Sequence, residues 1–206
     1  MASPDGLARL VADSPQISAL PWTDEGDRWA ELLFCALYQL RKANPLGTRQ
    51  AVHVILGLGL GRPDRLASLS QHEASAIGLA LSNSGWPSNQ IVPAIDLLAA
   101  LAGRVKSKGK VQRLLREAAE SLRDTLEKAF ASPAISEAKL RSIIGHWLQN
   151  VCNLPLVIAD EDLNELASQL GMTVSQLYEA ADEIDLNFCA LDDLAMAKKA
   201  AARADE

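Results

Sequence analysis

The chain has 206 residues, of which 49% are hydrophobic, 22% are charged and only 4% are aromatic, and its formal net charge is −6. This apolar content excludes a disordered chain, and because Ala and Leu supply most of it, closely packed helices are favoured. The longest apolar stretch, residues 91–103, includes Pro93 and Asp96 and is shorter than the roughly 20 residues that a membrane-spanning helix needs. We therefore expect a soluble, all-α protein without a membrane partner.

Two further features favour a cytoplasmic location. Asp5 stands where a signal peptide would carry basic residues. The three cysteines, Cys35, Cys152 and Cys189, are odd in number and far apart, which indicates reduced thiols rather than a disulfide framework.

Helix start and stop signals divide the first half of the chain after a short leading segment. Ser70 and Glu73 form a capping box, which is typical of a helix start, and apolar residues recur at steps of three and four along the other segments. These signals predict a helix from Thr23 or Asp24 to about Ala43, one from the capping box to about Ser82, one over residues 89–102 that ends at Gly103, and one over residues 111–131.

The dipeptide Ser132-Pro133 predicts a boundary between an N-terminal bundle, residues 1–131, and a smaller acidic C-terminal subdomain, residues 132–206. In the second part the predicted helices begin after the caps Ser136 and Asp160, at the capping box of Thr173 and Gln176, and near Leu191. Together the segments predict a multi-helix bundle of about eight or nine helices.

Residues 163–184 resemble a helix-turn-helix, because Ala167, Gly171 and Leu177 occupy its small, glycine and apolar positions. The second helix of this pair carries carboxylates and no base, so it would set negative charge against DNA phosphates. We interpret the pattern as a packing motif within the acidic part.

Charge is distributed unevenly along the chain. Residues 1–116 have a balance of +4 and residues 117–206 a balance of −10. A run of thirteen residues contains six cations without an intervening acid, and this basic segment suits a nucleic-acid backbone or an acidic protein, although such runs are often only solvated loops. Its cations are Arg104, Lys106, Lys108, Lys110, Arg113 and Arg116, and the secondary basic contacts that we predict are Arg49, Arg62 and Arg65.

The C-terminal part has no Lys or Arg between Arg141 and Lys198. We predict an acidic partner surface there, formed by Glu179, Asp182, Glu183 and Asp185. Opposite charges on one chain allow a head-to-tail contact, in which the acidic part of one copy meets the basic segment of another copy or of a neighbouring subunit.

No catalytic, cofactor or metal motif is found. Residues 51–61 could form a strand and a glycine-rich phosphate loop, but Arg62 stands where a dinucleotide fingerprint needs its third glycine, so we predict a helix from Thr48 and no cofactor. His53, His72 and His146 lack metal-ligand spacing. We expect the four tryptophans, Trp22, Trp29, Trp86 and Trp147, to anchor the core or contacts between helices; Trp22 and Trp86, each beside a proline, are the two candidates for exposure to a partner.

From these observations the sequence predicts a non-enzymatic protein–protein interaction or assembly subunit of a larger complex. The first alternative is a nucleoprotein subunit that contacts RNA or DNA backbone through the basic segment 104–116 without reading sequence. The second is a helical enzyme whose site is assembled from distant residues, such as the three histidines.

Overall fold

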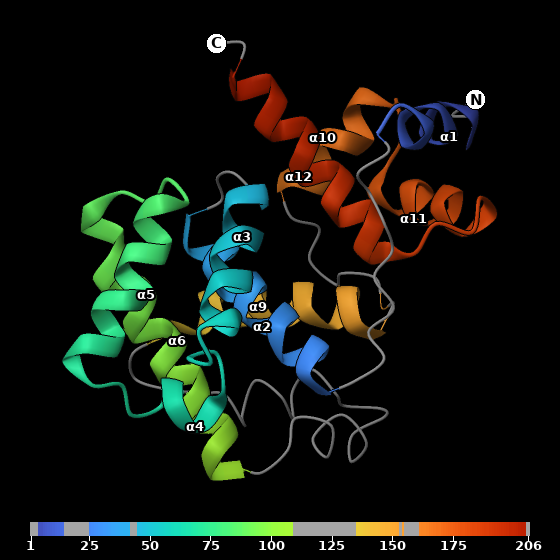
Figure 1. The fold of residues 1–206 in the computed structure, drawn as a ribbon. Helices are drawn as coiled ribbons and strands as arrows, with labels where there is room; N and C mark the ends of the chain where they lie inside the picture. The colour runs from blue at the N-terminus through green and yellow to red at the C-terminus, as the bar shows by residue number, and fades with distance from the viewer. Residues whose placement is uncertain are drawn as a thin grey trace. The chain divides into compact units, whose positions relative to one another are not determined.

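The computed structural model describes residues 4–14, 25–41, 45–108, 135–152, 154 and 161–204. This part of the chain forms ten helices and contains no strand (Figure 1), which confirms the all-α, multi-helix prediction. None of these helices combines the length and hydrophobicity that crossing a bilayer requires. The helices are α1 (Pro4–Ala12), α2 (Glu25–Arg41), α3 (Pro45–Gly57), α4 (Pro63–Leu66), α5 (Gln71–Asn83), α6 (Ser88–Lys108), α9 (Glu137–Cys152), α10 (Glu161–Gln169), α11 (Val174–Glu183) and α12 (Phe188–Ala204).

The contacts group the chain into two compact units. The N-terminal unit comprises residues 23–144, and the C-terminal unit joins residues 1–22 to residues 145–206. The sequence placed residues 1–22 with the N-terminal half as a short leading segment, whereas they contribute α1 to the C-terminal unit. The predicted boundary at Ser132-Pro133 lies outside the described residues.

In the N-terminal unit, α2 is the helix on which the others are built. Every residue from Glu31 to Gln39 is buried, and both α3 and α6 pack on α2. The next layer is formed by α5, which packs on α3 and α6, and by α4, which packs on α6. The indole Nε1 of Trp29 donates a hydrogen bond to the carbonyl of Gly61, so α2 also holds the connection that follows α3.

In the C-terminal unit, α1, α10, α11 and α12 pack around one core of buried hydrophobic side chains. Leu7 of α1 is fully enclosed in this core, together with Leu163, Leu177 and Leu191. A Cβ added at Gly6 would lie 3.3 Å from Leu170, so the missing side chain at this position lets α1 approach the turn after α10. The amphipathic pattern of α1 therefore serves packing that is distant in sequence.

Four helices end in the same way. Gly59, Gly85, Gly171 and Asp185 adopt positive φ angles of 69°, 81°, 66° and 55°, and the next amide donates to the carbonyl five residues earlier at 2.8–3.2 Å. This is the Schellman arrangement, in which the residue after the turn is usually apolar and packs back on the helix. Trp86 occupies that position after α5 and is 4% exposed, which agrees with the expected anchor role and not with the alternative of exposure to a partner; Trp22 lies outside the described residues.

The predicted capping boxes are confirmed. The Ser70 hydroxyl accepts from the Glu73 amide while the Glu73 carboxylate accepts from the Ser70 amide, and Thr173 and Gln176 repeat the arrangement at α11. Residues 170–173 separate α10 from α11, and Ala167 and Leu177 are buried in one core. The packing role of these residues agrees with the structure, whereas the helix-turn-helix resemblance itself stays a prediction.

Two element bounds differ from the prediction. Residues 51–56 are helical, as expected, but α3 already begins at Pro45. Gly103 was expected to end a helix, whereas α6 continues through it to Lys108. Gly103 has open space around it and the preceding turns of α6 are buried against α2 and α4, so tertiary packing outweighs the low helix propensity of one glycine. The predicted helix over residues 111–131 lies outside the described residues.

Candidate interaction surface

The basic segment is only partly placed. Arg104 is half-buried and Lys106 is exposed, both on α6, and only the backbone of Lys108 is described. The segment therefore begins within α6, beyond the helix end that was predicted at Gly103. Lys110, Arg113 and Arg116 lie outside the described residues, so the role of the whole segment as a partner contact stays a prediction.

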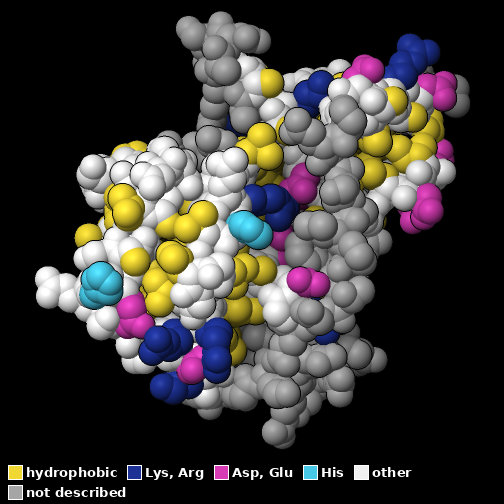
Figure 2. Space-filling model, viewed as in Figure 1, with side chains coloured by type: hydrophobic (Ala, Val, Ile, Leu, Met, Phe, Trp, Pro, Cys, Tyr) yellow, Lys and Arg dark blue, Asp and Glu magenta, His cyan; other side chains and the backbone are white. Residues whose placement is uncertain are grey.

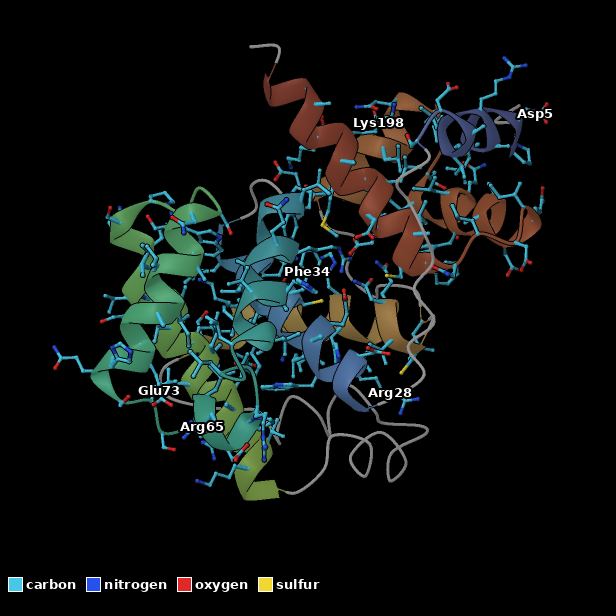
Figure 3. All side chains as sticks on the ribbon, in the orientation of Figure 1. Asp5, Arg28, Phe34, Arg65, Glu73 and Lys198 are labelled. Atoms are coloured by element: carbon cyan, nitrogen blue, oxygen red, sulfur yellow. The ribbon has the colours of Figure 1, made fainter. Side chains whose placement is uncertain are left out.

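The secondary basic contacts are engaged within the chain. Arg62 pairs with Asp64 at 3.2 Å, and Arg65 pairs with Glu73 at 3.4 Å. Figure 3 shows Arg65 and Glu73 side by side, where α4 lies near the start of α5. Exposed ion pairs of this kind contribute little to stability. Each cation is nevertheless neutralised by a nearby carboxylate, so this end of the unit presents little net charge to a polyanion.

Arg49 has a different role from the one predicted. Its Nη1 lies 3.0 Å from Oε2 of Glu31, which is 1% exposed, and its guanidinium carbon lies 3.9 Å from the centre of the Phe34 ring. An ion pair and a cation–π contact thus join α3 to α2. Arg49 neutralises a buried carboxylate, so its charge is already engaged within the chain, and its use as a polyanion contact stays a prediction.

The predicted acidic partner surface is exposed. Glu179, Asp182 and Glu183 lie on the solvent side of α11, and Asp185 lies in the turn that follows. The opposite side of α11 carries Leu177 and Ala181 into the core, so the amphipathic helix necessarily presents these carboxylates outward. Their use by a partner stays a prediction.

The three histidines have unlike surroundings. His53 on α3 and His72 on α5 are exposed, whereas His146 on α9 is 2% exposed. Within the described residues no group of three His, Cys, Asp or Glu side chains could hold a metal ion.

A buried polar cluster surrounds the second half of α9. Nδ1 of His146 lies 3.2 Å from Oδ2 of Asp192 on α12, and the Tyr178 hydroxyl of α11 donates to Oε1 of Gln149. All four side chains are enclosed, with exposures between 0% and 9%. The two hydrogen bonds help to fix how α9, α11 and α12 pack within the C-terminal unit, but Oδ1 of Asp192 is buried without a hydrogen-bond partner among the described residues.

A second buried ionic group joins α12 to α10. Nζ of Lys199 lies 2.7 Å from Oδ1 of Asp162 and 2.8 Å from Oε2 of Glu161. Burial lowers the pKa of the Lys199 ammonium, but the hydrogen bonds and charges of Asp162 and Glu161 outweigh burial and raise it. The group is structural, because its charges satisfy one another inside the unit.

The most unusual surface lies on three helices of the N-terminal unit. Residues 50–61 and 74–95 contain no Asp, Glu, Lys or Arg, whereas a chain with 22% charged residues would carry about seven in 34 positions. Since α5 packs on both α3 and α6, the outward side of α5 adjoins the outward sides of its neighbours. We call this surface the neutral face; its exposed residues are Leu46, Gln50, His53, Val54, Leu58, Ser75, Leu79, Ser82, Asn83, Ser88, Asn89, Val92 and Pro93. The exposed carboxylate of Asp96 borders this face, since it lies one turn beyond Val92 on the same side of α6.

The neutral face also gathers exposed apolar side chains. Leu46, Val54, Leu58, Leu79 and Val92 are 44–64% exposed, and they are five of the six large apolar side chains that are exposed in the described part of the chain. In Figure 2 hydrophobic side chains gather over α3 and α5, whereas Lys, Arg, Asp and Glu lie at α4 and the start of α5 and again beside α3 near the centre of the view. The sequence signal for this face, two long charge-free runs, was missed because half of each run is core.

Comparisons of the chain with protein-family models, with curated proteins and with solved structures returned no match.

Proposed function

We propose that this chain is a non-enzymatic interaction or assembly subunit, and that it binds protein through the neutral face. The observation that carries the proposal is that five of the six large apolar side chains exposed in the described part of the chain lie on three neighbouring helices, four of them within runs that contain no charged residue. Exposed leucines that stand singly are ordinary, but contiguous apolar surface is typical of a docking site. Depletion of charge is likewise the compositional mark of an interface core.

The energy available from this face is sufficient for specific binding. Fully burying a leucine or valine is worth about 1.5–3 kcal/mol, and each of the five side chains is already about half covered. Completing their burial therefore contributes about 1 kcal/mol each, or about 5 kcal/mol together. Covering the neighbouring Gln50, Pro93 and serine side chains excludes water from this contact.

The test compares the native particle mass of four chains expressed in the same cells. Leu79→Glu and Val92→Glu each place a carboxylate on the neutral face, and Leu154→Glu is the matched control, because Leu154 is the sixth exposed apolar side chain and lies outside these three helices. We expect the wild type and Leu154→Glu to elute well above 22.1 kDa, and both face variants to elute at the monomer mass with unchanged circular dichroism.

Two results would contradict the proposal. If the wild-type chain already elutes as a monomer under native conditions, no assembly exists. If the face variants keep the wild-type particle mass while charge reversal at Lys106 reduces it and removes bound nucleic acid, the nucleoprotein alternative is the better description.

A further inference from the structure

We infer that the surface covered by α1 is a binding site for a basic amphipathic helix of a protein partner, and that α1 is its displaceable intramolecular occupant. We call this surface the α1 site. It is formed by α11 and by Leu170, which follows α10, and Leu7 of α1 is enclosed there (Figure 1). The α1 site belongs to the C-terminal unit, so it is independent of the neutral face.

The helix α1 is peripheral to a core that three other helices complete. The helices α10, α11 and α12 pack on one another, and they share the buried side chains of Leu163, Leu177 and Leu191. The ion pair of Lys199 with Asp162 also joins α12 to α10. These contacts do not involve α1, so they persist when α1 leaves. Segments with few buried contacts open at a lower free energy than the core beside them.

The helix α1 also has little stability of its own. It has nine residues, and isolated helices shorter than about 12–15 residues are marginal in water. Among the described residues of α1 only Leu7 is buried, whereas Leu10 and Val11 are partly buried. After α1 the chain enters the N-terminal unit and returns to the C-terminal unit only at residue 145. Packing alone therefore retains α1, and a helix that packs better can replace it.

The packing of α1 defines the shape of helix that the site accepts. Leu7, Leu10 and Val11 are three and four residues apart, so they share one side of α1 and pack on the core of the unit. A Cβ added at Gly6 would lie 3.3 Å from Leu170, so a small residue is needed there. The site therefore selects a helix that carries a small residue followed by this apolar spacing, as amphipathic helices are commonly recognised.

The charge of the site favours a basic helix over α1 itself. The solvent side of α11 carries Glu179, Asp182 and Glu183, and α11 contains no Lys or Arg. Packed helix axes are about 8–10 Å apart, a distance over which charges are only partly screened at physiological ionic strength. Residues 4–14 contain two Asp and one Arg, so α1 offers no net positive charge. A helix with Lys or Arg on its exposed side gains an attraction that α1 lacks.

The test uses the full-length chain and two labelled peptides with the sequence of residues 1–14. One peptide carries Ala8→Lys and Ala12→Lys, and the other carries Ala8→Glu and Ala12→Glu. Both positions are exposed on α1, so the peptides differ only in the sign of two charges. The host chains are the wild type, Leu7→Glu, which places a carboxylate in the core and expels α1, and Ala8→Glu, which places the same group on the exposed side. Fluorescence anisotropy in about 50 mM NaCl measures the dissociation constants.

We expect the Leu7→Glu chain to bind the lysine peptide at least about 10-fold more tightly than the wild-type and Ala8→Glu chains do, because α1 occupies the site in those two. The glutamate peptide should bind the Leu7→Glu chain about 10-fold more weakly than the lysine peptide, and about 1 M NaCl should reduce this difference. In the wild-type chain the amides of α1 should exchange with solvent faster than those of α11 and α12.

Three results would overturn the inference. If the Leu7→Glu and wild-type chains bind the lysine peptide equally, or if neither binds it, α1 does not cover a binding site. If the two peptides bind with equal affinity, the site has no preference for a basic helix. If Leu7→Glu loses more helix by circular dichroism than α1 contains, or if the α1 amides exchange as slowly as those of α11, then α1 is an integral part of the core and is not displaceable.

Discussion

Removing the ammonium of Lys199 should strongly lower the free energy of unfolding of the C-terminal unit. The Asp162 side chain is fully enclosed and the Lys199 side chain is 8% exposed, with 2.7 Å between Oδ1 and Nζ. Breaking a buried pair from one side costs about 3–5 kcal/mol, because the remaining charge is left without a partner. Asp162 lies in the first turn of α10, where the helix dipole favours a negative charge, so we expect Lys199→Met to cost about 3 kcal/mol.

The matched variant replaces both partners. In Asp162→Leu combined with Lys199→Met no buried charge remains, so the loss should shrink to about 1 kcal/mol or less. Urea denaturation gives the total change, and hydrogen exchange of the α10 and α12 amides shows that it lies in this unit. A loss below about 1 kcal/mol for Lys199→Met alone, or an equal loss for the double variant, would refute the reasoning.

The pH dependence gives an independent measurement of the same pair. Because the folded pKa of Lys199 is raised above its ordinary value of 10.5, the stabilisation is fully present below pH 10.5 and is lost as the pH rises through the folded value. Wild-type stability should therefore decline in that alkaline range, and the Lys199→Met variant should lack this part of the decline.

Three further changes test local features. Gly103→Ala should raise stability by about 0.5–1 kcal/mol, since Gly103 is inside α6 with nothing within 4 Å of an added Cβ; an unchanged urea midpoint would contradict this. Asp185→Gly should raise stability by up to about 1 kcal/mol, because the φ angle of Asp185 is 55° and glycine adopts such angles without strain, whereas Asp185→Ala should lower stability. Equal urea midpoints for the two variants would count against backbone strain at this position. Hydrogen bonds from the Ser70 backbone amide and then from its hydroxyl lower the pKa of Glu73 below 4.5, so stability should fall as the pH drops through that lowered value. Glu73→Gln keeps the capping box and should make the melting temperature depend less on pH between pH 3 and 6. An unchanged dependence in this variant would refute the reasoning.

Local signals predicted the helix starts well. Ser70 with Glu73 and Thr173 with Gln176 form the expected capping boxes, and the Ser136 hydroxyl accepts from the Lys139 amide as a cap should. These contacts join residues three apart, so their energies are set by the neighbouring sequence and change little with the fold.

Signals that depend on distant residues were less reliable. Gly103 is a strong stop signal, yet α6 continues because its preceding turns are buried against other helices. Trp86 beside a proline left exposure open as an alternative to an anchor role, and its position after a left-handed glycine turns it back onto α5. For Gly103 the deciding contacts are made by α2 and α4, which the local pattern does not include.

The amino-acid sequence by itself determined the all-α class, the capped helix starts and the charge carried by each stretch of chain, because these follow from composition and from contacts within one helical turn. Only the tertiary structure decided which charges are available. Arg49 meets Glu31 18 residues away and Lys199 meets Asp162 37 residues away, so cations that look solvated are partners of buried carboxylates. Tertiary packing also selected which side of α3, α5 and α6 became the neutral face, since an uncharged run has the same sequence whether it is core or surface.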